Sequence, residues 1–441
     1  MMKMKTAEAE KIQNAVTSQD LAAQPERKKS LYWRIVAVIA VLTAILAALS
    51  FVTPFCDWYA NNAYIYLCDG LTRLTADIPF VLGEMMMYLG IVMVLFSVIF
   101  LVLLPFLRKK RSYRKFCGGY FKTFLIMLLC ILFIYMPMWL IPFRSSVMGV
   151  GKVDKRTEFT YDEIYALLEY SVNGLNQAAE EIEITEEGEV VFPTMDETQP
   201  LIAEALVNIS DEFPRMRGVY PAVKPALCSD ILERMWIGGF TYPFTMEATH
   251  NKYTSPTYQP VLDAHELTHH KGYYKENEAE FISQLALINS DDPLLRFSAY
   301  SQMYDFVWDE WFETVELLQI QMIEEIMASG NYDFTPFPKT EEESARNMEL
   351  WEELKLEEKF AEAFKAPEIS DRAIQIENAG FVIAEEIYEE DSHPIDEMPA
   401  VNEAIEETAD VGWETQSEIL QENTYDGVTL LLLQYFDGIL Y

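Results

Sequence analysis

Three uninterrupted apolar runs dominate the first third of the chain. Residues 35–56, 85–107 and 123–143 contain no charged side chain. Each run is long enough to supply the ~20 residues that a helix needs to cross the hydrocarbon core of a bilayer. The pattern therefore predicts three transmembrane helices and a lipid bilayer as partner. The first run is not expected to be a cleaved signal peptide, because a long polar leader precedes it and no small-x-small cleavage site follows it.

Beyond the third run, apolar residues recur at helical spacing. Amphipathic helices are expected over residues 159–184, 195–213, 277–289 and 292–329. Residues 238–253 carry the aromatic and β-branched side chains of a short strand or an extended loop. The predicted fold class is therefore mostly α, with three transmembrane helices followed by an extracytoplasmic α domain that has a small β part.

Composition divides the C-terminal part of the chain in two. One segment is strongly acidic and interrupted by prolines, which is typical of a peripheral, partly disordered insertion. The last segment is apolar again and predicts a helix that returns to the core of the outer domain. Five parts are expected: a cytoplasmic leader (1–33), a membrane region (34–145), an outer domain (146–338), the acidic insertion (339–423) and a C-terminal helix (424–441).

Basic clusters predict the orientation in the membrane. Residues 26–34 precede the first run and residues 108–115 separate the second run from the third, and both are rich in Lys and Arg. Because short basic loops stay in the cytoplasm, the N-terminus is expected inside and the large domain outside. The outer loop between the first two runs holds Cys56 and Cys68, and whether they form a disulfide is left open.

Charge is distributed very unevenly. The formal net charge is −37, yet residues 1–150 contain 16 basic and 8 acidic side chains and are net positive. The remainder is correspondingly acidic, and it would be repelled by a phosphate backbone. Nucleic acid is therefore not expected as a partner, and the acidity is typical of a solvated surface with a loosely ordered segment.

The stretch AHELTHHKGYYKENEAEF, residues 264–281, carries the candidate chemistry. His265 and His269 are four residues apart, so on a helix they lie on one face and can bind one Zn²⁺ ion. Glu266 is placed to act as the general base on a zinc-bound water. Gly272 is the expected end of this helix, because glycine readily adopts the left-handed conformation of a C-terminal cap.

A third ligand is expected from a second helix that begins near Lys275. The His-type pattern H-E-x-x-H-x-x-G-x-x-H would require histidine at this position, so that class is disfavoured. Glu276 and Glu280 lie four residues apart on one stripe. Glu276 is the predicted ligand and Glu280 would orient a ligand histidine, while the reverse assignment remains open.

An H-E-x-x-H pattern also arises by chance in helices that bind no metal. Two features favour a metal site over that alternative. The whole chain contains five histidines, and three of them fall within this stretch. A glycine and a glutamate-bearing segment also follow the motif at workable spacing. His270 points away from the face shared by His265 and His269 and is expected at the surface.

The pair HELTH and ENEAEF resembles the gluzincin pattern of metallopeptidases, in which H-E-x-x-H is completed by the glutamate of an E-x-x-A-[N/D] segment. The match departs at Glu280, where Asn or Asp is usual. Several other stretches resemble a family of bacterial membrane proteins of unknown function with three N-terminal spans and an outer zincin-like domain: PFVLGE, FTYDEIYALLEY, KPALCSDIL, GGFTYPFTMEATHN, AHELTHHKG and YDGVTLLLLQYF. The resemblance implies a zincin-like fold and peptidase chemistry, but no substrate.

The residues around the motif suggest further roles. Residues 244–251 are expected as the edge strand of the zincin-like domain, which would pair with an extended peptide. Glu247 and Asn251 would then line the cleft, or they have a purely structural role. A donor to the oxyanion is also needed, and Tyr425 is chosen over Tyr273 and Tyr274 because it opens the returning C-terminal helix.

The leading hypothesis is a membrane-anchored zinc metallopeptidase that hydrolyses a peptide or protein outside the cytoplasm. The alternative is a non-catalytic, zinc-stabilised ectodomain that acts as a sensor or scaffold of the envelope, and it would require a metal with four protein ligands and no open position. A transporter is disfavoured, because the spans carry almost no ionisable residue beyond Glu84.

Overall fold

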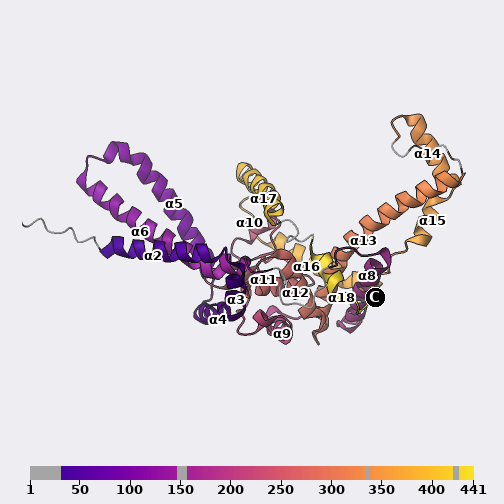
Figure 1. Cartoon of the computed structure of the whole chain (residues 1–441), viewed down its shortest axis with the longest axis horizontal. Coiled ribbons are helices and arrows are strands. Elements are labelled where there is room, and N and C mark those ends of the chain that lie inside the picture. Colours follow the sequence, from indigo (N-terminus) through magenta and orange to yellow (C-terminus); the bar gives the residue numbers. More distant parts are fainter. Residues whose placement is uncertain (1–30, 147–155, 331, 333–334, 336–337, 421–426) are drawn as a thin grey trace, which may run out of the picture.

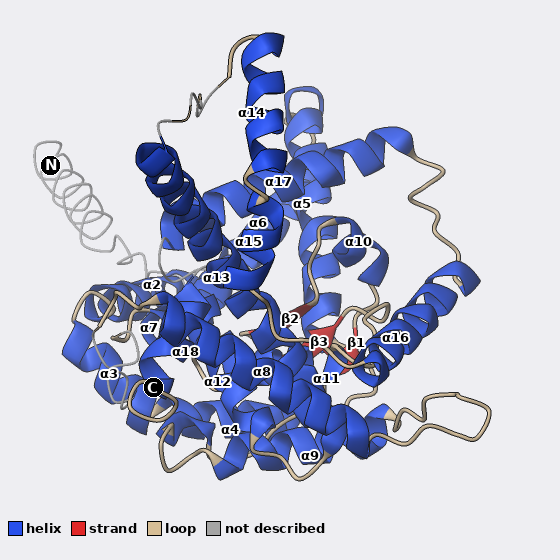
Figure 2. Ribbon diagram, turned by 90° about the vertical axis from the view of Figure 1, so that its right-hand side faces the viewer, coloured by secondary structure: helices blue, strands red, loops and turns tan. Residues whose placement is uncertain are grey.

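The computed structural model describes residues 31–146, 156–330, 332, 335, 338–420 and 427–441. Within these residues helices dominate, and they surround one short sheet (Figure 2). This confirms the mostly α fold class predicted from the sequence. The leader expected at residues 1–33 lies almost entirely outside the described residues.

Three N-terminal helices are long and apolar enough to cross a membrane, as predicted. They project together from the rest of the protein (Figure 1). Their side chains are largely uncovered by protein, which suits contact with lipid. The segments are α2 (Leu31–Leu49), α5 (Leu82–Leu107) and a continuous stretch made of α6 (Arg111–Tyr135), the π-helical turn η1 (Met136–Leu140) and α7 (Ile141–Phe143).

The first span ends earlier than its apolar run, and two short helices follow it. Pro54 lies in the first turn of α3 (Thr53–Asn62), where its missing N–H costs no helical hydrogen bond. Helix α4 (Tyr64–Thr75) comes next. These helices hold Cys56 and Cys68 as free buried thiols, so the disulfide left open by the sequence is not formed.

The outer domain has a core of buried Leu, Ile, Phe and Ala side chains contributed mainly by α8, α9, α11, α12, α13 and α18. Helices α8 and α13 pack along each other. Capping boxes at Thr160 and Thr194 begin α8 and α9. The bounds are α8 (Tyr161–Glu181), α9 (Met195–Asn208), η2 (Pro214–Met216), α10 (Ser229–Arg234), α11 (Gln259–His270), α12 (Glu276–Ile288), α13 (Pro293–Gly330) and α18 (Val428–Phe436).

The sheet contains β1 (Lys224–Pro225), β2 (Gly239–Tyr242) and β3 (Glu247–His250) in the order β1-β3-β2. Strand β3 pairs in parallel with β1 and antiparallel with β2. Both sides of β3 are therefore occupied, and the prediction of an edge strand at residues 244–251 is wrong. The edge of the sheet on the side of β2 is formed by residues 239–242.

The acidic segment forms four helices in the described residues: α14 (Glu341–Glu353), α15 (Leu356–Ala363), α16 (Asp371–Glu390) and α17 (Pro399–Leu420). Partial disorder and a peripheral position were expected for this segment, and its parts differ in position. Helices α14 and α15 and the distal part of α13 extend away from the core (Figure 1). Helix α16 instead packs on α8 and buries Ala373 and Ile376 in the main core, so part of this segment belongs to the domain.

A second apolar cluster joins the membrane-proximal helices to the outer domain. Tyr64 of α4 and Met138 of η1 pack with Met246 and Tyr274 of the outer domain. The Tyr274 hydroxyl donates to the Met138 carbonyl oxygen at 2.6 Å. Burial of several large side chains at one junction makes the membrane region and the outer domain parts of one folded unit.

Candidate metal centre

Two consecutive helices create the candidate site. Helix α11 begins with Pro260 in its first turn and ends before Gly272, whose φ of +87° is favourable for glycine. A side chain at Gly272 would also meet the Tyr64 ring, since an added Cβ would lie 2.8 Å from Cε1. Helix α12 begins at Glu276 after the turn. Because α11 and α12 pack together, the start of α12 faces the C-terminal half of α11.

The side chains of His265, His269 and Glu276 converge on one point. The Nε2 atoms of His265 and His269 each lie 3.2 Å from Oε2 of Glu276. All three ligand atoms lie within 4.8 Å of one another. The structure thus brings together the three residues that the sequence analysis predicted as metal ligands.

The other nitrogen of each imidazole is already engaged. Nδ1 of His265 lies 2.9 Å from Oε2 of Glu280, and Nδ1 of His269 lies 2.7 Å from the Tyr273 carbonyl oxygen. These contacts fix the ring orientations and leave both Nε2 atoms directed at Glu276. A carboxylate or carbonyl behind the imidazole is the usual support of a metal-bound histidine. Glu280 therefore lies behind a histidine, as predicted for it.

The donor set fits a zinc ion. Two imidazole nitrogens and one carboxylate oxygen are a common ligand set of catalytic zinc sites, which keep a fourth position for water or substrate. With Zn–N and Zn–O bonds of about 2.0–2.2 Å, neighbouring ligand atoms of a tetrahedral site are about 3.3–3.6 Å apart. The two 3.2 Å separations from Glu276 agree with that spacing.

Electrostatics at the site favour a cation. Burial works against the charge on His265, but the hydrogen bonds and charges of Glu276 and Glu280 outweigh it and raise the pKa of this imidazole. Burial likewise opposes the charge on Glu276, yet the two histidines lower its pKa. The two carboxylates thus stabilise positive charge at the histidines, and a divalent ion at the Nε2 atoms would meet the negative charge of Glu276.

Glu266 is buried beside the histidines and is held by strand β2. The Thr241 hydroxyl donates to Oε2 and to the carbonyl oxygen of Glu266, both at 2.8 Å. Burial raises the pKa of the Glu266 carboxyl, and the neighbouring histidines oppose that shift. Gly239 allows this approach, because an added Cβ would lie 2.8 Å from Cγ of Glu266. The sequence analysis missed both β2 residues, although the GGFTY stretch marked a strand there.

Other predicted residues have structural contacts. The Glu247 carboxylate accepts from the backbone N–H groups of Leu82 and Gly83 at 3.1 and 2.9 Å and pairs with Lys224 at 2.8 Å. This ties the start of α5 to the sheet, in agreement with the structural alternative. Asn251 is also buried, and its side-chain amide donates to Glu233.

The three tyrosines considered as oxyanion donors differ in their positions and contacts. Tyr425 lies outside the described residues. The hydroxyl of Tyr274 is turned toward the membrane-proximal helices, where it contacts Met138 and Tyr64. Tyr273 contributes its carbonyl oxygen to His269, while its ring packs against the Arg215 guanidinium. The oxyanion donor therefore remains unassigned.

His270 is fully buried, so the prediction that it lies at the surface is wrong. Its Nε2 atom lies 3.1 Å from Sγ of Cys68 and 3.3 Å from Oγ1 of Thr72. Both partners belong to α4, so this helix covers the side of α11 on which His270 lies. Helical periodicity identified the face correctly but gave no sign that another helix covers it.

The fold and the site together define a mostly helical protein with three membrane-length helices and a cluster of potential metal ligands outside them. Residues 59–364 match the family model described as "Protein of unknown function (DUF3810)", and the chain belongs to this family. The match includes α11 and α12 with the whole ligand cluster, and it ends before α16. No curated protein and no solved structure matches the chain.

Proposed function

We propose that this protein is a membrane-anchored zinc metallopeptidase of the gluzincin type, which hydrolyses peptide bonds outside the cytoplasm. The observation that carries the proposal is the convergence of two imidazole nitrogens and one carboxylate oxygen, with a buried glutamate next to the first histidine. The basic clusters before α2 and between α5 and α6 support the orientation, because such clusters stay in the cytoplasm.

Different residues of this chain would bind the metal and transfer the proton. His265, His269 and Glu276 would hold the zinc ion, and Glu280 and the Tyr273 carbonyl would keep the imidazoles in place. A bound zinc ion supplies a Lewis acid for a carbonyl oxygen and lowers the pKa of a water molecule. Glu266 would accept the proton of that water and deliver it to the nitrogen of the leaving amine.

Strand β2 supports peptide chemistry in particular. It is the edge strand beside Glu266, and Thr241 connects the strand to this glutamate. An extended peptide can add to an exposed sheet edge through main-chain hydrogen bonds, which recognise any sequence. A scissile bond bound along β2 would lie next to the proposed general base.

The non-catalytic alternative requires a fourth protein ligand. Glu280 and His270 are the further candidates for that role in the same stretch of sequence. Glu280 is engaged with Nδ1 of His265 on the far side of the ring, and His270 is turned toward Cys68 and Thr72. This arrangement favours an open coordination position and therefore the catalytic proposal.

The test compares wild type with Glu266→Gln, purified as full chains in detergent. We expect both proteins to contain one zinc per chain, while the variant loses peptide hydrolysis because glutamine cannot accept the proton. Quantitative proteomics of cells carrying each form should then reveal an envelope protein that accumulates uncut with Glu266→Gln. Hydrolysis that persists in the variant would contradict the role of Glu266, and wild-type protein without zinc would contradict the whole proposal.

A further inference from the structure

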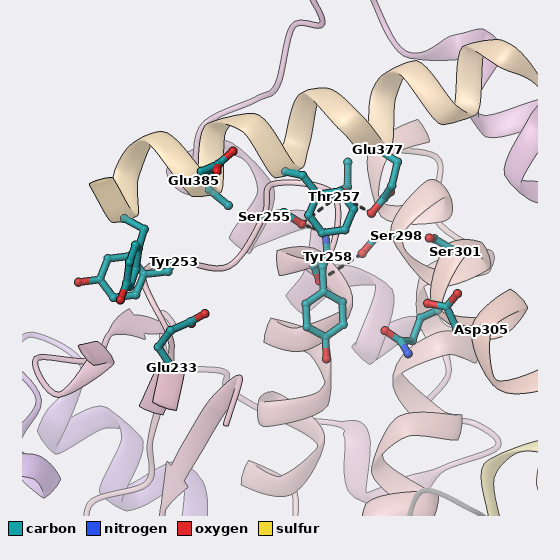
Figure 3. Close-up of a pocket in the computed structure, with 14 residues that line it drawn as sticks. Glu233, Tyr253, Ser255, Thr257, Tyr258, Ser298, Ser301, Asp305, Glu377 and Glu385 are labelled. Atoms are coloured by element: carbon teal, nitrogen blue, oxygen red, sulfur yellow. Dashed lines mark hydrogen bonds between the residues drawn. The ribbon is translucent and has the colours of Figure 1, made fainter. Parts of the chain in front are cut away.

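A cavity of about 530 Å³ lies beside the N-terminal end of α11 (Figure 3). Its walls come from four parts of the chain: Glu233 of α10, the loop of residues 253–258 that leads into α11, residues 298–305 of α13, and one face of α16. Its volume is within the range of small-molecule and side-chain sites. None of the metal ligands lines it, so it is a separate feature of the molecule.

The charged side chains that line the cavity are all acidic. It includes the carboxylates of Glu233, Asp305, Glu377 and Glu385, and it includes no Lys, Arg or His. Figure 3 shows these side chains distributed around the cavity, with Glu377 and Asp305 near one end and Glu233 near the other. Aromatic side chains form much of the remaining wall: Tyr253, Tyr258, Phe381 and Tyr388. Carboxylates with aromatic faces are the usual surroundings of a bound organic cation.

One carboxylate oxygen in this cavity lacks a partner. Oε1 of Glu377 accepts from the Thr257 hydroxyl at 3.1 Å. Oε2 of the same group is shielded from solvent and has no hydrogen-bond partner in the protein. A buried acceptor without a donor costs free energy, so a ligand that brings its own N–H group would find an acceptor here that no protein group occupies.

The cavity is held open by a fixed wall. At its start, α16 is attached to α8 through Arg372, whose guanidinium donates to the carbonyl oxygens of Ala179 and Ile182. In its middle, Gly380 packs directly on Thr257, with no room for a larger residue. At its end, Asp391 pairs with Lys252. The acidic side chains on α16 are therefore positioned before any ligand binds.

Tyr258 connects the cavity to the candidate metal centre. It lines the cavity, and it directly precedes α11, the helix that carries His265 and Glu266. His265 follows Tyr258 by seven residues, which is about 10 Å along a helix axis at 1.5 Å per residue. A peptide bound at the metal centre would have the cavity within reach of a neighbouring side chain.

We propose that this cavity binds a guanidinium or ammonium group, and that it receives an Arg or Lys side chain of the peptide substrate. The cavity offers the carboxylate acceptors and aromatic faces that such a group needs, whereas an acidic side chain would be repelled. The assignment to a substrate rests on the proposed function; the binding of an organic cation does not. Residues of the acidic segment would then select the substrate of the enzyme.

Binding is measured on the full-length Glu266→Gln protein in detergent, where cleavage cannot interfere. The probe is acetyl-Ala-Ala-Arg-Ala-Ala-amide, and its control replaces arginine by citrulline, which has the same shape without the charge. We expect the arginine peptide to bind at least about tenfold more tightly, as one charge-assisted contact implies. Equal dissociation constants, measured by calorimetry, would overturn the proposal.

Substitutions of cavity residues test whether the cavity causes the difference in affinity between the two peptides. Asp305→Asn and Glu377→Gln, singly and together, should bring the ratio of the two dissociation constants toward one. Glu386→Gln is the matched control, because this exposed residue is next to Glu385 on α16 but does not line the cavity. Zinc content and the thermal midpoint show that each variant is folded. A ratio that persists in the double variant would place the cation elsewhere and overturn the assignment.

A final measurement distinguishes an arginine side chain of a peptide from a free amine as the ligand of the cavity. Agmatine carries a guanidinium group without a peptide, and we expect it to bind more weakly than the arginine peptide because it makes no contact along β2. Agmatine binding as tightly as the peptide would contradict the substrate assignment and indicate a site for free amines. Cation selectivity without any hydrolysis by wild type would contradict the peptidase while leaving the cavity assignment intact.

Discussion

The substitution Gly239→Ala tests whether β2 positions the general base. The added Cβ would lie 2.6 Å from the Thr249 carbonyl oxygen, 2.8 Å from Cγ of Glu266 and 2.9 Å from its Oε1. Cβ atoms in proteins stay beyond 3.0 Å from such neighbours, so something must shift by several tenths of an ångström. The Thr249 oxygen belongs to the backbone of the central strand, and it cannot rotate away. The movement must therefore fall on β2 and on the Glu266 side chain.

The size of the effect follows from this geometry. Overpacking of a buried position costs about 1–3 kcal/mol of stability, so the protein should still fold. A displaced catalytic group can lose about 100-fold in rate even when the shift is only about 1 Å. The metal ligands are on α11 and α12 rather than on β2, so the zinc content should not change. We therefore expect a large loss of kcat with one zinc per chain retained.

The assay uses purified full chains and the envelope substrate found by comparing wild type with Glu266→Gln. Gly238→Ala is the matched control, because its Cβ would meet only the end of the Leu262 side chain, at 2.9 Å from Cδ1, which can rotate. The control should keep most of the activity. Full activity of Gly239→Ala, or an equal loss in Gly238→Ala, would refute the idea that close approach of β2 orients Glu266.

Three further predictions concern other contacts. Glu280→Gln removes the charge behind His265 and should weaken zinc binding by about 10–100-fold in a chelator competition, whereas Glu278→Gln should not. Tyr64→Ala should cost about 3–5 kcal/mol in the free energy of unfolding, because this ring is fully buried at the junction of the two regions. Asp305→Asn should raise the thermal midpoint at pH 7.5 by only about 2–4 °C, because Asp305 is exposed and solvent screens much of the unfavourable charge.

The sign of the Asp305 effect follows from its pKa, which partial desolvation by the surrounding side chains and the charge of Asp309 raise to about 6. An acid with a raised folded pKa destabilises the fold as pH rises from its unfolded pKa to its folded one. The advantage of asparagine should therefore be complete above about pH 6 and vanish below about pH 4. A gain that is the same at pH 4 and pH 7.5 would contradict this. Unchanged zinc affinity in Glu280→Gln would contradict the first prediction. An unchanged free energy of unfolding in Tyr64→Ala would contradict the second.

The sequence predicted those features that depend on local pattern alone. Uncharged runs of more than ~20 residues have few structural alternatives to a membrane span, and the structure has three helices at those positions. The spacing of His265, His269 and Glu276 depends only on helix geometry and a glycine turn. Local pattern was therefore enough to identify the residues that the structure brings together.

Features that depend on distant parts of the chain could not be predicted in this way. His270 is buried because α4, two hundred residues earlier, covers it. The order of strands is likewise a property of the tertiary structure, so β3 was taken for an edge. Helix α16 was not predicted as part of the core because its composition is acidic. Ala373, Ile376 and Gly380 nevertheless show the spacing of a buried helical face.

X-ray absorption at the zinc edge, measured on the purified full-length protein, tests the central claim most directly. The account predicts one zinc per chain with imidazole nitrogen and carboxylate or water oxygen ligands at about 2.0–2.2 Å, and loss of this signal in His265→Ala. Absence of zinc from wild type would contradict the account. A sulfur shell at about 2.3 Å would do the same, because it would place the metal on cysteines rather than on α11 and α12.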